Sequence, residues 1–114
     1  MIEVSDERFE ELVDDGLDRI PEEFLPHLRN TVVLIDDYHP DNPHILGLYH
    51  GVALPLRTSD YSGHAPATIT IYRAALKDYC HTEAQLVEEV AVTVAHEIGH
   101  HFGLDDDELH ALGY

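Results

Sequence analysis

The chain has 114 residues and a mass of 12.9 kDa, which is enough for one domain with one modest hydrophobic core. Its 6 Lys and Arg against 23 Asp and Glu give a formal net charge of -17. That charge repels phosphate backbones and anionic lipid headgroups, so nucleic acid and membrane surfaces are excluded as expected partners. We expect a single domain over residues 1–114, with no signal segment or membrane span. Because Cys80 is the only cysteine, we expect a cytoplasmic protein in which Cys80 is a small buried residue.

The first half of the chain predicts one helix and two strands. Apolar residues at helical spacing predict a helix from the N-cap Ser5 to Ile20, ended by Pro21. The β-branched run Thr31–Ile35 (TVVLI) predicts a buried strand. Turn formers over Asp36–Pro43 predict a loop, and a second strand is expected over Ile45–His50.

The second half predicts a third strand and two helices after an irregular stretch over Leu54–Pro66. Ala67–Arg73 (ATITIYR) alternates as a strand does. Thr82 and Gln85 form a capping box, which predicts a long helix over Glu83–Phe102, and a short helix is expected over Asp106–Leu112. The prediction is a compact α+β fold, in which about three strands pack on one long helix together with N-terminal and C-terminal helices.

The long helix contains the motif that carries chemistry. His96-Glu97-Ile98-Gly99-His100 is followed by Gly103 and Asp106, which gives the pattern H-E-x-x-H-x-x-G-x-x-D. Residues four apart leave the same face of a helix, so the two imidazoles can hold one Zn²⁺. Glu97 can reach a water on the metal and act as general base.

A third ligand requires the chain to reverse after the helix. Gly103 can adopt the left-handed conformation that ends a helix, and Asp106 can then present its carboxylate to the metal. Asp105, Asp107 and Glu108 are the alternatives, and spacing favours Asp106. In so histidine-rich a chain, the five-residue motif arises in about 8% of shuffled sequences, whereas the extended pattern arises in about 0.05%. The extended pattern is therefore the specific signal.

The whole chain resembles the minimal zincin family, which consists of small bacterial zincin-like metallopeptidases. The resemblance extends beyond the motif to three blocks, ILGLYHGVALPLR, PATITIYRAAL and VEEVAVTVAHEIGHHFGLDDDELHALGY. It implies a compact α+β zincin core, a zinc site at His96, His100 and Asp106, and Glu97 as the catalytic acid/base.

Several other residues have a functional interpretation beside a structural one. His110, Tyr72 and Tyr114 are candidates for stabilising the oxyanion formed at a cleaved carbonyl, and the sequence does not choose among them. His101 is expected to be a packed, hydrogen-bonded histidine rather than a ligand. If the strand over Ala67–Arg73 lies at a sheet edge, it can hold an extended peptide substrate; as an inner strand it cannot.

The sequence therefore predicts a cytoplasmic, zinc-dependent metallopeptidase. It would hydrolyse a peptide or protein substrate through a metal-bound water, with Glu97 as general base. The alternative is a metal-binding zincin-like module with little or no peptidase activity that acts through a protein partner. An iron(II) site is a third interpretation, because two histidines and a carboxylate also form an oxygenase triad.

Overall fold

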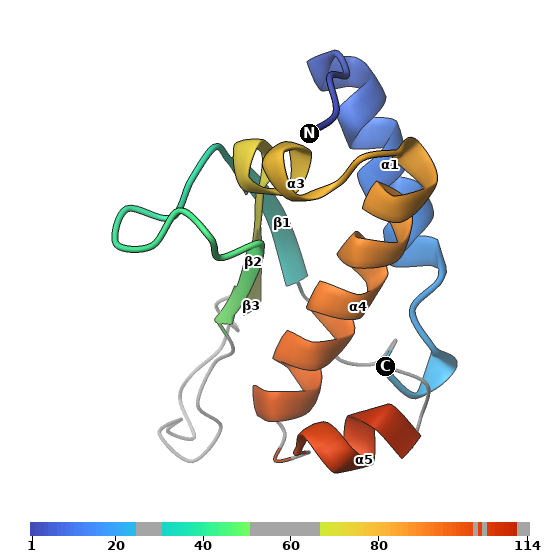
Figure 1. Cartoon of the computed structure of the whole chain (residues 1–114). Coiled ribbons are helices and arrows are strands. Elements are labelled where there is room, and N and C mark those ends of the chain that lie inside the picture. The colour runs from blue at the N-terminus through green and yellow to red at the C-terminus, as the bar shows by residue number, and fades with distance from the viewer. Residues whose placement is uncertain (25–30, 51–66, 102, 104, 112–114) are drawn as a thin grey trace, which may run out of the picture.

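The computed structural model describes residues 1–24, 31–50, 67–101, 103 and 105–111, and it leaves out the side chains of Glu23, His101 and Asp106 within them. The described elements in chain order are α1 (Asp6–Asp18), a 3₁₀ turn (Glu22–Phe24), β1 (Thr31–Asp36), β2 (Gly47–His50), β3 (Ala67–Tyr72), α3 (Arg73–Tyr79), α4 (Glu83–His101) and α5 (Asp106–Ala111). The predicted α+β fold, with three strands, a long helix and helices near both ends of the chain, is confirmed (Figure 1). The irregular stretch predicted over Leu54–Pro66 lies outside the described residues.

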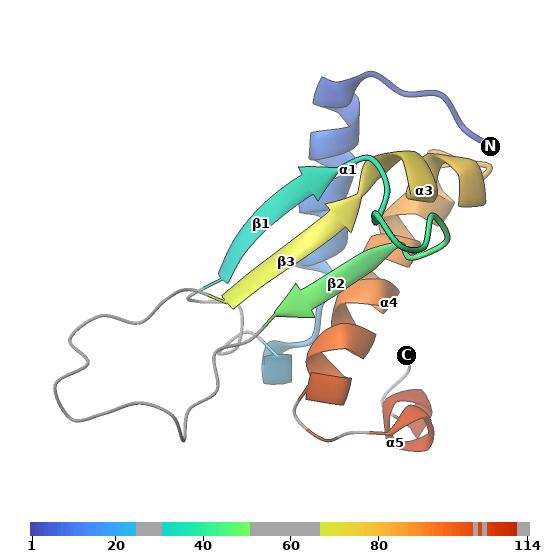
Figure 2. The ribbon, with the colours of Figure 1, turned by 90° about the vertical axis from the view of Figure 1, so that its left-hand side faces the viewer.

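The three strands form one mixed sheet in the order β1-β3-β2. β1 runs parallel to β3, with Thr31 opposite Ala67, and β2 runs antiparallel to β3, with Tyr49 opposite Ile69. β3 is therefore the inner strand of the described sheet, as Figure 2 shows, so of the two alternatives left open for this segment the inner strand holds and the substrate-binding edge does not. The edge strand beside α4 is β2.

β1 is more exposed than its sequence predicts. Val32, Val33 and Leu34 are 43%, 38% and 49% exposed. The expectation of a buried strand is wrong because β1 pairs only with β3, at the far edge of the described sheet from β2. An apolar run of this length predicts a strand but does not reveal how many neighbours cover it.

α1 and α4 lie side by side and cover one face of the sheet (Figures 1 and 2). Gly16 permits this close approach, since a Cβ there would lie 2.7 Å from Cβ of Val90 on α4. The core between the layers is built mainly from Phe9, Leu12, Val13, Ile69, Ile71, Leu86, Val90, Val94 and Ile98. Within the described residues, no helix has the length and apolar character needed to cross a bilayer.

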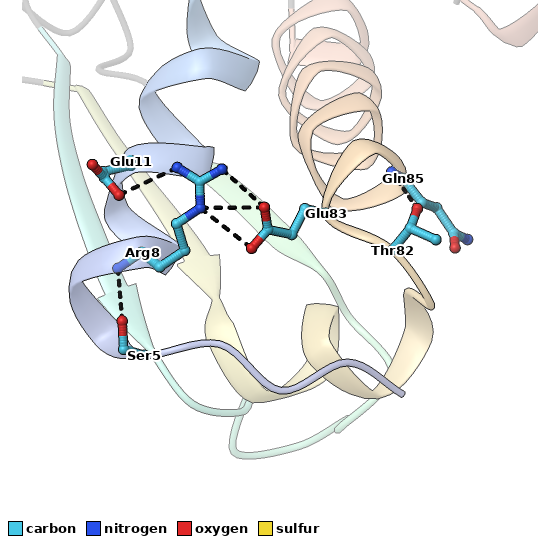
Figure 3. Close-up of polar contacts among 6 residues, drawn as sticks. All are labelled: Ser5, Arg8, Glu11, Thr82, Glu83 and Gln85. Carbon is cyan, nitrogen blue, oxygen red and sulfur yellow. Dashed lines mark hydrogen bonds and ion pairs between the residues drawn. The ribbon is translucent and has the colours of Figure 1, made fainter.

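Both predicted helix starts are capped by side chains (Figure 3). Oγ of Ser5 accepts a hydrogen bond from the Arg8 amide at 3.1 Å, and Oγ1 of Thr82 accepts one from the Gln85 amide at 3.0 Å. The Gln85 side chain accepts a hydrogen bond from the amide of His81, at 2.8 Å. Each cap satisfies a backbone donor that the first helical turn would leave unpaired.

An ion pair joins α1 to the first turn of α4 (Figure 3). The guanidinium of Arg8 lies 2.8 Å from Oε1 of Glu83 and 3.3 Å from Oε1 of Glu11. Hydrogen bonding to Arg8 lowers the pKa of the Glu83 carboxyl, and Glu83 and Glu11 raise the pKa of Arg8. Because all three groups are exposed, the ion pairs contribute little to stability.

α3 is an element that the sequence analysis did not predict. Residues 73–79 (RAALKDY) include strong helix formers, but the segment is short and follows the strand β3 directly. The carbonyl oxygen of Asp37 accepts hydrogen bonds from the amides of Ala74 and Ala75, at 3.1 and 3.3 Å. These tertiary contacts stabilise a helix whose local sequence carries no side-chain cap.

Candidate metal centre

α4 carries the H-E-x-x-H motif in its last two turns and is continuous through it. The rings of His96 and His100 lie with their centroids 5.7 Å apart, edge to face. His96 and Glu97 are half-buried, and His100 is exposed. The structure thus brings together two of the predicted ligands on one helix face, as helical periodicity requires. Their role as metal ligands stays a prediction.

The chain reverses after α4 at Gly103, as predicted. Gly103 has a φ of 89°, and its amide donates to the carbonyl oxygen of His100 at 3.1 Å. Only glycine adopts this left-handed conformation without steric cost, so it ends the helix at this point. α5 then begins at Asp106 and lies beside the motif, at the C-terminal end of α4 (Figure 1).

Gly99 allows α5 to pack closely against the motif. Its position faces Leu109 of α5, which is fully buried, and a Cβ on Gly99 would lie 2.5 Å from Cδ2 of Leu109. Sequence reasoning treated Gly99 as one of the two variable positions of the motif. The structure gives it a packing role, because any larger side chain would collide with the side chain of Leu109 on α5.

His110 lies beside His96. The centroids of their rings are 6.1 Å apart, across the contact between α4 and α5. Of the other two candidates for oxyanion stabilisation, Tyr72 is buried and its ring contacts His39 at a centroid distance of 5.7 Å. Tyr114 lies outside the described residues. Among the three candidates, His110 is thus the one that the described residues place at the motif.

The acidic run after Gly103 contains a capping box that the sequence analysis missed. Oδ1 of Asp105 accepts from the amide of Glu108 at 2.8 Å, and Oε1 of Glu108 accepts from the amide of Asp105 at 3.3 Å. The spacing of an N-cap acid and a glutamate three residues later was the available signal. Both carboxylates are therefore engaged at the start of α5, which disfavours them as metal ligands.

The third ligand is not tested by the structure, because the side chain of Asp106 lies outside the described residues. The same holds for the side chain of His101. Among the side chains that are described, no three of His, Cys, Asp or Glu gather closely enough to hold a metal ion. The prediction that Asp106 completes the site remains open.

The side chain of Glu97 contacts the strand β2. The backbone amide of Tyr49 on β2 donates to Oε1 of Glu97 at 3.4 Å. β2 comes this close to α4 because Gly47 has no side chain; a Cβ there would lie 2.9 Å from Cγ2 of Thr93. This contact depends on strand order and register, so the sequence alone held no signal for it.

A half-buried carboxyl, Glu89 on α4, and the buried thiol of Cys80 just before it have raised pKa values. Burial, with the nearby charge of Glu88, raises the pKa of the Glu89 carboxyl, and His96 partly offsets this. Burial raises the pKa of the Cys80 thiol to about 11, so the thiol is protonated at neutral pH. Cys80 is fully buried, which confirms its predicted role as a small core residue.

The donor set matches zinc in kind. Two imidazoles one helical turn apart are among the ligand types of catalytic zinc sites, which take a third protein ligand and leave one position open. Residues 28–114 match the sequence family described as zincin-like metallopeptidase. The chain belongs to this family.

The match includes the three strands and every element from α3 to α5, so the described part of the zincin-like fold lies almost wholly within it. Among solved structures, the chain is similar to a conserved hypothetical protein from Thermus thermophilus, at 25% sequence identity and a TM-score of 0.56. That similarity covers 86% of this chain and 94% of the other. No curated protein matches the chain.

Proposed function

We propose that this protein is a zinc-dependent metallopeptidase that hydrolyses peptide bonds. His96, His100 and Asp106 would hold the Zn²⁺, and Glu97 would be the general base. The observation that carries the proposal is that Glu97, next to His96 in the helix that carries the imidazole pair, accepts a hydrogen bond from the amide of Tyr49 on the strand β2. A carboxylate there lies beside the metal ligands and also beside a strand that can bind a peptide.

When bound, zinc would polarise the substrate carbonyl and lower the pKa of the attacking water. Glu97 would accept a proton from that water and deliver it to the leaving amine. The amide of Tyr49 donates to Oε1 of Glu97, and this bond would orient the carboxylate for the proton transfer. The half-buried position of Glu97 also limits competition from bulk water.

The proposed substrate is an extended segment of a peptide or protein. β2 is an edge strand of the described sheet, so its outward backbone groups other than the Tyr49 amide, which donates to Glu97, can pair with such a segment. The charge of -17 makes nucleic acid and anionic membranes poor partners. The predicted cytoplasmic location is part of the same proposal and rests on the single cysteine.

We propose His110 as the side chain that stabilises the oxyanion, because its ring lies 6.1 Å from that of His96. A donor aimed at the developing charge contributes about 10²-fold to 10³-fold to kcat. His110→Ala would therefore lower kcat by roughly that factor and leave the zinc content unchanged. An equal loss of zinc would instead assign His110 to the metal site.

The test compares zinc content and peptidase activity in the wild type, Glu97→Gln and His96→Ala. Wild-type protein purified without a tag should contain one zinc per chain by mass spectrometry and lose activity when the metal is chelated. Glu97→Gln should retain zinc and lose turnover, whereas His96→Ala should lose both. Peptidase activity retained in Glu97→Gln would refute the mechanism.

Other outcomes identify the alternatives. Zinc bound without turnover of any peptide in a diverse library would favour a metal-binding module that acts through a protein partner. In that case Glu97→Gln would retain full function in cells. Stoichiometric iron in place of zinc would favour the oxygenase-type site.

A further inference from the structure

A pocket of about 690 Å³ lies between the segment joining β1 to β2 and the helix α3. Leu46 and Ala75 give it an apolar floor, and Tyr38 and Tyr79 stand at its rim beside Asp78. The helix α3, which forms one of its walls, lies at the end of the molecule opposite α5 (Figure 1). The proposed peptidase chemistry makes no use of this pocket.

The walls of the pocket are held in place by backbone hydrogen bonds. The segment joining β1 to β2 is fixed at its start, where the carbonyl oxygen of Asp37 accepts hydrogen bonds from the amides of Ala74 and Ala75. The other end is fixed where the carbonyl oxygen of Leu46 accepts from the Tyr72 amide at 3.0 Å. Because these hydrogen bonds join the two walls to each other, the pocket is preformed before a ligand binds.

The rim combines aromatic rings with a carboxylate. Tyr38 and Tyr79 are 44% and 54% exposed, which places two of the most exposed aromatic side chains at one pocket. The hydroxyl of Tyr38 donates to Oδ2 of Asp78 at 2.5 Å, and this bond raises the pKa of Tyr38. Tyrosine faces attract cations, and a carboxylate adds a charged partner.

The surrounding charge also favours a cation. The segment from Asp36 to Leu46 contains Asp36, Asp37 and Asp41 but no Lys or Arg. The guanidinium of Arg73 is paired with Asp37, at 2.9 Å, and so does not occupy the pocket. Among the described lining residues, His44 is the one whose side chain can become positively charged.

We propose that this pocket binds a lysine side chain of a peptide, with the aliphatic stem on Leu46 and Ala75 and the ammonium group between Asp78 and the two tyrosines. Lysine fits better than arginine, since Oδ2 of Asp78 already accepts from Tyr38 and one carboxylate oxygen remains. A guanidinium is best bound by two oxygens, whereas an ammonium acts as a point charge.

The pocket lies beside the start of the edge strand that reaches Glu97. Leu46 precedes β2, and Tyr49, three residues later, donates to Glu97. Three residues of strand span about 10 Å. This inference rests on the proposed function. For a peptide paired with β2, the spacing predicts that the pocket selects a lysine about three residues from the scissile bond.

The first test measures binding without turnover. The Glu97→Gln protein, labelled with ¹⁵N, is titrated with N-acetyl-lysine methylamide and with its norleucine analogue, at about 0.1 M salt to screen general attraction. We expect saturable shifts confined to the amides around Leu46 and Ala75–Tyr79 with the lysine compound and none with norleucine. Binding of the two compounds with equal affinity, or shifts spread over the acidic surface, would overturn the proposal.

Variants of the rim sharpen the test. Asp78→Asn and Tyr79→Leu should each weaken lysine binding by about fivefold or more, while Tyr79→Phe, which keeps the aromatic face, should bind like the parent protein. Asp14→Asn makes the same charge change on an exposed position of α1 and should also bind normally. Equal weakening in Asp14→Asn and Asp78→Asn would mean that net charge alone attracts the ligand, and would refute the proposal that lysine binds in this pocket.

The peptide library then separates this inference from the peptidase proposal. If lysine binds but no peptide is cleaved, the pocket is supported as a binding site and the peptidase proposal fails. If peptides are cleaved without preference for lysine, and Asp78→Asn leaves kcat/KM unchanged, the peptidase proposal is supported and the role of the pocket in selectivity is refuted.

Discussion

Replacing Gly99 by alanine tests whether α5 is a working part of the metal centre. The new Cβ would lie 2.5 Å from Cδ2 of Leu109 and 3.3 Å from its Cγ. Ordinary carbon contacts are about 3.5–4.0 Å, so the Leu109 side chain, or the helix that carries it, must shift by roughly 1 Å. Because Leu109 is fully buried, we expect part of this shift to be taken up by α5.

The expected change in the free energy of unfolding follows from two opposing effects. Overpacking costs about 1–3 kcal/mol, and replacing glycine by alanine inside a helix returns about 1 kcal/mol. The net loss of unfolding free energy should therefore be about 0–2 kcal/mol. The part of this roughly 1 Å shift that α5 takes up is expected to exceed the tolerance of about 0.2 Å for metal–ligand distances, so zinc affinity should fall at least about tenfold.

The assay is competition for zinc against a chelating dye, performed well below the melting temperature of each variant. Gly16→Ala is the matched control, since its Cβ would lie 2.7 Å from Val90 and would strain the contact between α1 and α4 instead. We expect Gly16→Ala to lower the melting temperature and keep wild-type zinc affinity. If Gly99→Ala binds zinc as tightly as the wild type, or if the control loses as much affinity, α5 does not position the site.

Three further predictions concern stability. Burial raises the pKa of Cys80 from 9.0 to about 11, so the unfolded state loses its proton first and stability should fall as pH rises from 9 to 11. Urea unfolding should show this slope in the wild type and a shallower one in Cys80→Ala, where the raised pKa values of Tyr38, Tyr49 and Tyr72 still contribute. Gly103→Ala should cost about 1–2 kcal/mol because of its positive φ, and a thermal unfolding curve identical to the wild type would contradict that reasoning. Thr82→Ala should cost about 1 kcal/mol in urea unfolding by removing the cap on Gln85, whereas Thr82→Ser should be neutral.

The parts of the fold that were predictable are those encoded locally. The caps at Ser5 and Thr82, the helical spacing of apolar residues and the left-handed Gly103 each depend on a few neighbouring residues. The same holds for the imidazole pair, because helical periodicity alone places His96 and His100 on one face.

The parts that were missed depend on contacts between distant segments. The exposure of β1 follows from the strand order, and α3 is stabilised by the carbonyl oxygen of Asp37, which comes well before it in the chain. The contact between Tyr49 and Glu97 requires both the register of β2 and its distance from α4. Asp105 and Glu108 are a different case, since the spacing of their capping box was visible in the sequence, but the two residues were considered there as alternative metal ligands.

The exposed β1 edge has a practical consequence for the behaviour of the protein in solution. An edge strand with three exposed apolar residues, paired on one side only within the described sheet, is a template for pairing with another chain. Repulsion between molecules that each carry a charge of -17 opposes this pairing at low ionic strength. The Debye length falls from about 30 Å at 0.01 M salt to about 3 Å at 1 M, which removes that protection. Concentrated stocks should therefore remain monodisperse in dilute buffer and self-associate as salt is added, the reverse of proteins whose association depends on complementary charges.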